Sequence, residues 1–431
     1  MQLKNFGLLR RVVQSRLGKG MVAASIWQIS NYLIPLITFP YLAHILGVDG
    51  VGLVGISAAI TSFALLVTNW GFPYTATQAV AANQQDVEAI SQIIWNTIAS
   101  RAILGAIAIA IMLVGSFFVA ENLSTLILIS TLNVLALIFN VDWVLRGLED
   151  FSKFAIATVA GRILVIPAVF ILVQQSNDIS YAVLATAVGS ISAAFFTSVV
   201  VYRKGVLRKP DITIVSMLDS IVESTHLFVS TLAVAVYTDG LSLIVGLASG
   251  VGQVGLYVGA DKIRKPGLGV LWPFSLVFFP RMNVLAKSNP EAANSMAFQL
   301  LAGIGILTFS VSACLSIFAS EIVHVFLGAS FFGAIIVLRF QAWLIFLIGL
   351  NTVLGTMMML PFGLKRQFTI CTIAGSISGL VACVPLAYFY GALGASASAL
   401  LAEIVVVILM AYYLRTVLSN FSIRTSMFRS K

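Results

Sequence analysis

Long apolar runs separated by short polar joints fill the chain from residue 20 to residue 415. A helix that crosses the roughly 30 Å hydrocarbon core of a bilayer needs about 20 mostly apolar residues, and each run is at least that long. The pattern predicts twelve membrane-spanning helices. Their expected ranges are 20–46, 51–81, 92–116, 122–146, 154–174, 180–202, 219–249, 254–280, 296–320, 331–360, 367–390 and 394–415.

The overall composition agrees with this pattern. Hydrophobic residues make up 59% of the 431 residues and charged residues only 10%, against roughly 25% charged in a soluble domain. The mean hydropathy is +1.02, and a water-soluble chain of this size would expose too much apolar surface. We therefore predict an all-α integral membrane protein.

The basic residues are distributed unevenly along the predicted topology. With the N-terminus inside, 19 of the 25 Lys and Arg residues fall in cytoplasmic segments or, for Arg146 and Arg415, at the cytoplasmic end of a span; six lie deeper within spans and none in the outer joints. This asymmetry follows the positive-inside rule. It predicts a multi-pass protein of the cytoplasmic (inner) membrane with both termini in the cytoplasm. The net charge of +9 then requires no nucleic acid partner.

Two pairs of similar segments indicate an internal duplication. The segments 47–53 and 250–256 agree at five of seven positions, and 154–161 and 368–375 agree at five of eight. Both matches relate helix n to helix n+6, so the two halves run in the same direction. We expect two parallel six-helix bundles around a central cavity, an arrangement common among transporters. The expected lobes are 1–205 and 206–431.

Charged residues inside the predicted spans are the first candidates for function. Each costs roughly 2.5–3.5 kcal/mol at mid-membrane on insertion scales, so such groups are expected to face water or one another. The densest group is Asp261, Lys262, Arg264 and Lys265. Its net positive charge suits a diphosphate or an acidic sugar. The alternative is a cluster that reaches the membrane interface and binds nothing.

Two further cations, Arg101 and Arg162, lie in the cytoplasmic halves of their predicted spans. Either could meet a phosphate that enters from the inner leaflet. Pairing with Asp142 or with a backbone carbonyl group is the alternative. Asp142 and Arg146 stand four residues apart, a spacing typical of a structural ion pair on one helix face.

Polar uncharged residues form a face on the first predicted helix, with Gln28, Asn31 and Thr38 at helical spacing. Thr238, beside Asp239, marks a similar face on the seventh, its equivalent in the duplication. These faces are expected to line the cavity, although hydroxyl groups often only join helices together. Asp239 and Asp261 are the candidates for coupling to an ion. The three histidines are dispersed, and no phosphate-binding loop occurs, so neither a metal nor a cofactor is expected.

Several motifs resemble bacterial O-antigen flippases (Wzx-type polysaccharide biosynthesis proteins). The similar segments are Leu36-Ile37-Thr38-Phe39-Pro40-Tyr41-Leu42-Ala43, Asn69-Trp70-Gly71-Phe72, Asp142-Trp143, Gly255-Leu256-Tyr257 and Ala260-Asp261-Lys262-Ile263. The resemblance implies the multidrug/oligosaccharidyl-lipid/polysaccharide exporter fold. It also implies an undecaprenyl-pyrophosphate-linked oligosaccharide as substrate and Na+ or H+ as coupling ion. Membrane lipids and other polysaccharide assembly proteins are the further partners that it implies.

Two other functions compete with the flippase hypothesis. A drug antiporter would share the topology, but it would more naturally carry acidic residues for cationic drugs than a net-positive helix. A membrane-embedded polymerase or ligase would need a large outer loop with catalytic groups, whereas the predicted outer joints are short. Transport rather than an enzymatic activity is therefore the favoured prediction.

Overall fold

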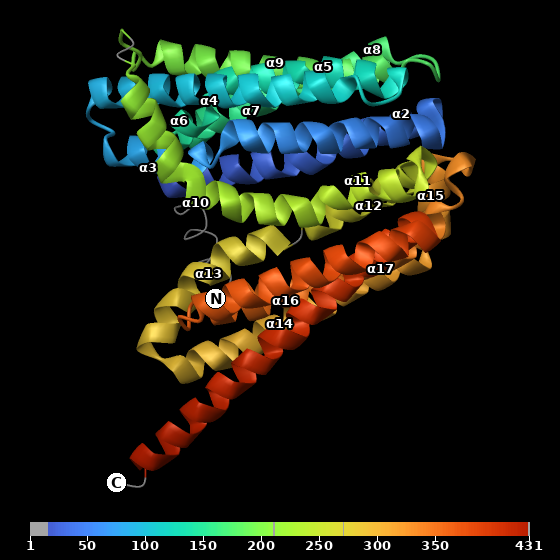
Figure 1. The fold of residues 1–431 in the computed structure, drawn as a ribbon. Helices are drawn as coiled ribbons and strands as arrows, with labels where there is room; N and C mark the ends of the chain where they lie inside the picture. Colours follow the sequence, from blue (N-terminus) through green and yellow to red (C-terminus); the bar gives the residue numbers. More distant parts are fainter. Residues whose placement is uncertain (1–15, 210–211, 270, 430–431) are drawn as a thin grey trace, which may run out of the picture. The chain divides into compact units, whose positions relative to one another are not determined.

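The computed structural model describes residues 16–209, 212–269 and 271–429, and its regular elements there are helices (Figure 1). By packing, the chain divides between Asp239 and Gly240 into two compact units. The division therefore falls inside the predicted seventh span. The lobe boundary predicted at residues 205 and 206 concerns the sequence duplication, and it stays a prediction.

Unit 1 is built on long helices that run alongside one another. Helix α9 packs against α5 and α7, and α2 packs against α4, α5 and α7. Trp143 is fully buried at the centre of one apolar cluster of this unit. The helices are α2 (Arg16–Asn69), α3 (Phe72–Ala82), α4 (Val87–Ser116), α5 (Glu121–Phe139), α6 (Asp142–Gly147), α7 (Phe151–Ile163), α8 (Val165–Leu172), α9 (Ile179–Arg203) and α10 (Ile214–Thr238).

In unit 2, α16 packs against α12, α14 and α17, and α11 packs against α17. Its apolar core includes the buried methionines Met282, Met357 and Met359. The elements are α11 (Gly240–Ser249), α12 (Val251–Leu268), α13 (Leu271–Ser288), α14 (Pro290–Ile317), α15 (Ala319–Leu327), the 3-10 turn η1 (Ala329–Phe331), α16 (Ala334–Asn351), the π-helix η2 (Thr352–Met359) and α17 (Lys365–Arg429).

Polar side chains cap several of these helices at their N-termini. The Asp86 carboxylate accepts hydrogen bonds from the backbone N–H groups of Glu88 and Ala89 at 3.0 Å each, at the start of α4. Asn289 caps α14 in the same way through Ala292. Such caps satisfy N–H groups that have no partner within the helix, so they fix where the helices begin.

Glycine provides the sharp turns between consecutive helices. Gly47 (φ 66°, ψ −172°) bends α2, and Gly250 (φ 88°, ψ 173°) precedes α12. This backbone region is open essentially only to glycine. The two residues are equivalent in the predicted duplication, and they adopt the same conformation.

The second pair of matched segments also agrees in structure. Gly161 of α7 lies directly against Ala193 of α9, and Gly375 lies against Val406 in the second half of α17. A side chain at either glycine would overlap that neighbour. Both glycines thus serve the same purpose, which is the close approach of two consecutive predicted spans within one unit.

Nine segments of the described residues are long and apolar enough to cross a membrane. Two of them, Val22–Ala82 and Lys365–Arg415, contain the bends at Gly47 and Gly391 and each cover two predicted spans. The predicted span 254–280 corresponds to α12 and α13 and is not among the nine. Four charged residues between 261 and 265 lower its apolar character. The count of twelve therefore stays a prediction.

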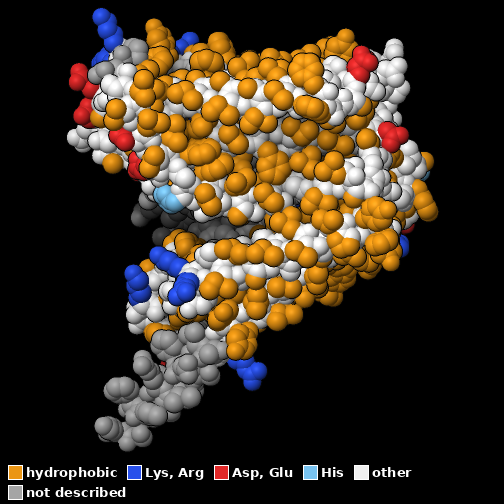
Figure 2. Space-filling model, viewed as in Figure 1, with side chains coloured by type: hydrophobic (Ala, Val, Ile, Leu, Met, Phe, Trp, Pro, Cys, Tyr) orange, Lys and Arg blue, Asp and Glu red, His pale blue; other side chains and the backbone are white. Residues whose placement is uncertain are grey.

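The described surface is consistent with contact with lipid. Figure 2 shows apolar side chains along the sides of the helices and most charged side chains near the helix ends. Ile111 of α4 and Leu247 of α11 are 64% and 90% exposed. Large exposed apolar surfaces of this kind are rare on monomeric soluble proteins and are expected on membrane proteins.

Candidate functional site

The charged cluster of α12 is organised around Asp261. Its carboxylate accepts a hydrogen bond from Arg264 Nη2 at 2.5 Å and lies 2.7 Å from Lys265 Nζ. The side chain of Lys265 is 48% exposed, whereas that of Arg264 is 10% exposed. With Lys262, which is half-buried, the cluster carries three cations and one anion. The predicted Asp261–Lys265 pair is therefore present, and the cluster keeps a net positive charge.

Arg101 of α4 lies deep inside unit 1, with an exposed fraction of 1%. Its guanidinium donates to the carbonyl oxygens of Leu137 (3.3 Å) and Asn140 (2.7 Å) and to Asn69 Oδ1 (2.9 Å). The two carbonyl groups belong to the C-terminal end of α5, where such groups lack partners within the helix. In this conformation Arg101 is a structural tie between α4, α5 and α2.

Arg162 has a different environment, at the contact between α7 and α2. It is half-buried and donates a hydrogen bond through Nη1 to Asn31 Oδ1. Its guanidinium carbon lies 6.0 Å from the centroid of the Trp27 ring. Trp27 Nε1 is itself buried and makes no hydrogen bond with the described residues. The structure thus brings together Arg162 and Asn31, two residues that the sequence singled out separately.

The other predicted polar residues are engaged locally. Thr38 donates to Ile34 O at 3.0 Å and Thr238 to Val234 O at 3.1 Å, each within its own helix. Gln28 Nε2 donates to the Tyr32 hydroxyl at 3.3 Å. Hydroxyl groups bonded to the preceding turn are common in helices, so these contacts neither require nor exclude a role in a cavity.

Asp239 lies at the break between α10 and α11. Its carboxylate accepts a hydrogen bond from Ser62 Oγ of α2 at 2.5 Å. The predicted pair of Asp142 and Arg146 is also present, with the charged atoms 3.4 Å apart. That ion pair is confirmed as part of the scaffold.

Beside Ser62, a polar cavity of about 240 Å³ lies between α2, α5 and α9 of unit 1. Among its lining residues, Ser57 and Ser130 are hydrogen-bonded at 2.9 Å, and Asn133 accepts a hydrogen bond from Ser190 of α9 at 2.7 Å. The sequence analysis missed this cavity. Its polar lining residues are Ser57, Thr61, Ser62, Ser130, Asn133 and Thr186. The signal that could have indicated the cavity is the presence of these polar residues within three otherwise apolar helices.

Among the described residues, no three His, Cys, Asp or Glu side chains come together as metal ligands.

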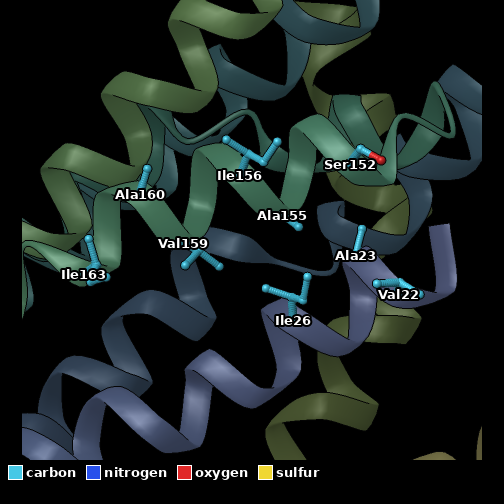
Figure 3. Close-up of a pocket in the computed structure, with 9 residues that line it drawn as sticks. All are labelled: Val22, Ala23, Ile26, Ser152, Ala155, Ile156, Val159, Ala160 and Ile163. Atoms are coloured by element: carbon cyan, nitrogen blue, oxygen red, sulfur yellow. The ribbon is translucent and has the colours of Figure 1, made fainter. Parts of the chain in front are cut away.

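A second hollow is an apolar groove of about 570 Å³ between the first turns of α2 and the length of α7. Figure 3 shows Val22, Ala23 and Ile26 on one wall, facing the residues of α7 on the other. The lining residues on α7 are Ser152, Ala155, Ile156, Val159, Ala160 and Ile163. The sequence analysis did not predict this groove, because its residues are indistinguishable from lipid-facing ones.

A family model described as "Polysaccharide biosynthesis protein" matches residues 17–286. The chain belongs to the polysaccharide biosynthesis protein family. Two similar proteins are both named "Putative O-antigen transporter". The one from Escherichia coli (strain K12) is 28% identical over 93% of this chain and 97% of its own length. The one from Shigella dysenteriae is 26% identical over 88% and 96%. The predicted family is therefore confirmed.

Solved structures show the fold of this polysaccharide biosynthesis protein. A multidrug resistance MATE family transporter of the MOP superfamily, in its inward-facing conformation, matches with a TM-score of 0.73 and 17% identity, covering 94% of this chain and 99% of that chain. The lipid II flippase MurJ matches with a TM-score of 0.70 and 13% identity, covering 92% and 87%. The chain is thus a multi-pass membrane protein with the predicted exporter fold, and its family and relatives associate it with transport in polysaccharide biosynthesis.

Proposed function

We propose that the protein flips undecaprenyl-pyrophosphate-linked oligosaccharide repeat units across the cytoplasmic membrane. It would do so by alternating access, coupled to a gradient of Na+ or H+, for the assembly of a surface polysaccharide. Sugar hydroxyls and a diphosphate cannot cross hydrocarbon unaided because the loss of their hydration is too costly. The polyprenyl chain is itself apolar and needs no polar path, so it can stay against lipid or an apolar protein surface.

The observation that carries this proposal is the net positive cluster of α12. Arg264 and Lys265 both contact the carboxylate of Asp261, and Lys262 adds a third cation to the same two turns. A cluster with excess positive charge within a predicted span favours an anionic solute, because charged hydrogen bonds to phosphate are among the strongest in proteins. A carrier of cationic drugs would gain nothing from it.

Deletion of the gene in its native host tests the function. We expect surface polysaccharide to disappear and undecaprenyl-linked units to accumulate on the cytoplasmic side of the membrane. Complementation with Lys262→Ala and with Lys265→Ala should restore the polysaccharide poorly. Lys287→Ala, which changes an exposed lysine at the end of α13, is the matched control and should restore it fully.

The outcomes separate the proposal from its rivals. Persistence of the polysaccharide without accumulation of lipid-linked units would exclude the flippase function, and a change only in drug susceptibility would favour the antiporter. Mass spectrometry of the translocated lipid distinguishes transport from catalysis. We expect an oligosaccharide of unchanged length, because transport forms and breaks no covalent bond.

A further inference from the structure

The apolar groove between α2 and α7 has the length of half a membrane. Its lining on α7 runs from Ser152 to Ile163 (Figure 3), which corresponds to about 16 Å at roughly 1.5 Å per helical residue. The hydrocarbon core of a bilayer is roughly 30 Å thick. The groove is therefore about as long as one leaflet is thick, and its lining includes the buried small residues Ala23 and Ala155.

A cationic corner adjoins the deep end of this groove. Arg162 directly precedes the lining residue Ile163, and it donates to Asn31 of α2. The indole N–H of Trp27, next to the lining residue Ile26, is buried and has no hydrogen-bond partner among the described residues, and the Trp27 ring centroid lies 6.0 Å from the Arg162 guanidinium carbon. A guanidinium has five N–H donors, so the bond to Asn31 leaves capacity for a bidentate contact with a phosphate.

We propose that this groove holds the polyprenyl chain of the transported lipid while Arg162, Asn31 and Trp27 hold its diphosphate. The proposal rests on the flippase function and assigns that substrate a subsite within unit 1. The apolar walls match the chain, and the positive charge of Arg162 matches the diphosphate. The two parts adjoin, as the chain and the diphosphate do in a prenyl diphosphate.

The predicted depth of Arg162, about eight residues into its span at 154–174, selects this occupant over a membrane phospholipid. A phospholipid keeps its headgroup at the interface, so its acyl chain would reach the groove with no charged group beside Arg162. A lipid in transit carries its headgroup away from the interface. Such a lipid can place an anion at Arg162 and its chain in the groove simultaneously.

Photocrosslinking in native membranes tests the occupant. Ile156, on the wall of the groove, and Ile171 of α8, outside it, are 70% and 71% exposed, so they form a matched pair. Each is replaced in turn by p-benzoyl-phenylalanine in the full-length protein. We expect undecaprenyl-diphosphate oligosaccharide to be captured at position 156 at least about tenfold more than at 171, the ratio that corresponds to about 1.4 kcal/mol of binding preference.

The charged corner is tested with the same crosslinker at position 156. Addition of undecaprenyl diphosphate should compete with the captured lipid, and the uncharged alcohol undecaprenol should not. Arg162→Gln should remove this difference and Arg162→Lys should keep it. Equal capture at 156 and 171, capture of phospholipid alone at 156, or competition by the alcohol and the diphosphate alike would each overturn the assignment. These crosslinking results do not depend on the deletion phenotype. A negative result would therefore overturn the assignment of the groove without contradicting the proposed flippase function.

Discussion

Arg101 and Arg162 are similar in sequence, since both are single cations in the cytoplasmic half of an apolar helix, but their surroundings differ. The partners of Arg101 are 32 to 39 residues away in the chain, and Asn31 is 131 residues away from Arg162. A pattern along one helix indicates that an intramembrane cation needs partners. The same pattern does not predict whether those partners bury the cation completely or leave it accessible to a ligand.

The enclosure of Arg101 gives a prediction about stability. Arg101→Ala removes three hydrogen bonds made by a charged donor and leaves buried carbonyl groups of α5 unpaired. We expect a loss of about 3 kcal/mol or more in the free energy of unfolding, because such bonds contribute roughly 1.5–3 kcal/mol each. Thermal unfolding of the purified protein in detergent measures this loss. If the variant is as stable as the parent and still fails to restore polysaccharide, Arg101 binds the substrate instead.

Asp150, in the joint between α6 and α7, gives a prediction about pH. Partial burial tends to raise its carboxyl pKa, but hydrogen bonds from Lys204 and the Lys153 backbone, together with both lysine charges, lower the pKa below its ordinary value. The Lys204 Nζ atom lies 2.7 Å from the carboxylate. A lowered pKa stabilises the folded state above the ordinary aspartate pKa of about 3.9, and this contribution is lost as the pH falls through the lower folded-state pKa.

The comparison of Asp150→Asn with the parent measures this contribution. At pH 7 the variant should unfold at a lower temperature, and the difference should shrink and vanish as the pH falls below about 4. Glu121→Gln, which changes an exposed acid at the start of α5, is the control and should track the parent throughout. A difference that stays constant well below pH 4 would show that the ion pair with Lys204 is not its source. Because asparagine can also cap a helix, a role of Asp150 as the N-cap of α7 alone predicts little difference at any pH.

The packing of helices at the matched glycines Gly161 and Gly375 gives a prediction about stability. Gly161→Ala and Gly375→Ala insert a methyl group where consecutive predicted spans touch. We expect each to lower the free energy of unfolding by about 1–3 kcal/mol, the usual cost of overpacking. Thermal unfolding in detergent is again the measurement.

Gly303→Ala is the control, because no neighbouring atom lies within 4 Å of the position that its new methyl carbon would take. It should be neutral or stabilising by up to about 1 kcal/mol, since alanine favours a helix more than glycine does. Equal behaviour of all three variants would mean that the helices separate freely at these contacts and that the matched glycines do not reflect a shared packing rule.

Apolar periodicity predicted the helices of unit 1 well and those around α12 less well. A run of apolar residues indicates a span whether or not the helix is interrupted, so the break at Asp239 and the change to the π-helix at Thr352–Met359 were not predicted. The polar cavity near Ser57 was missed for a related reason. Single hydroxyl residues on three separate helices become a cavity only when those helices are packed together.

The interruption at Asp239 leads to a prediction about coupling. We expect a carboxylate at a helix break, hydrogen-bonded to Ser62 at 2.5 Å beside a polar cavity, to be the group through which the ion gradient acts. In proteoliposomes, an imposed Na+ or H+ gradient should accelerate flipping by the parent protein. Asp239→Asn should abolish this acceleration and leave the rate without a gradient nearly unchanged. If the variant responds to the gradient like the parent, coupling resides elsewhere.

For the whole molecule, charge asymmetry and duplication predicted an orientation and two parallel six-helix bundles, and the motif resemblance implied the exporter fold. These signals are spread over many residues and therefore tolerate local errors. The number of crossings, in contrast, rests on one local feature. It depends on whether α12 and α13, with the charges of Asp261 to Lys265, pass through the membrane. Glu121 and Lys365 lie on either side of the α12–α13 segment in the chain, and seven predicted spans separate them.

The parity of these spans makes the count testable. An odd number of crossings puts Glu121 and Lys365 on opposite faces, whereas the loss of the α12–α13 crossing would put them on the same face. Single cysteines at the two positions, in a variant lacking Cys314, Cys371 and Cys383, can be labelled with a maleimide that cannot cross membranes. Both side chains are exposed.

We expect Glu121→Cys to react in intact spheroplasts and Lys365→Cys only after the membrane is opened, because basic joints remain in the cytoplasm. If both cysteines react in intact spheroplasts, the α12–α13 segment does not cross the membrane. The cationic cluster would then lie outside the translocation path, and the substrate assignment that depends on it would have to be abandoned.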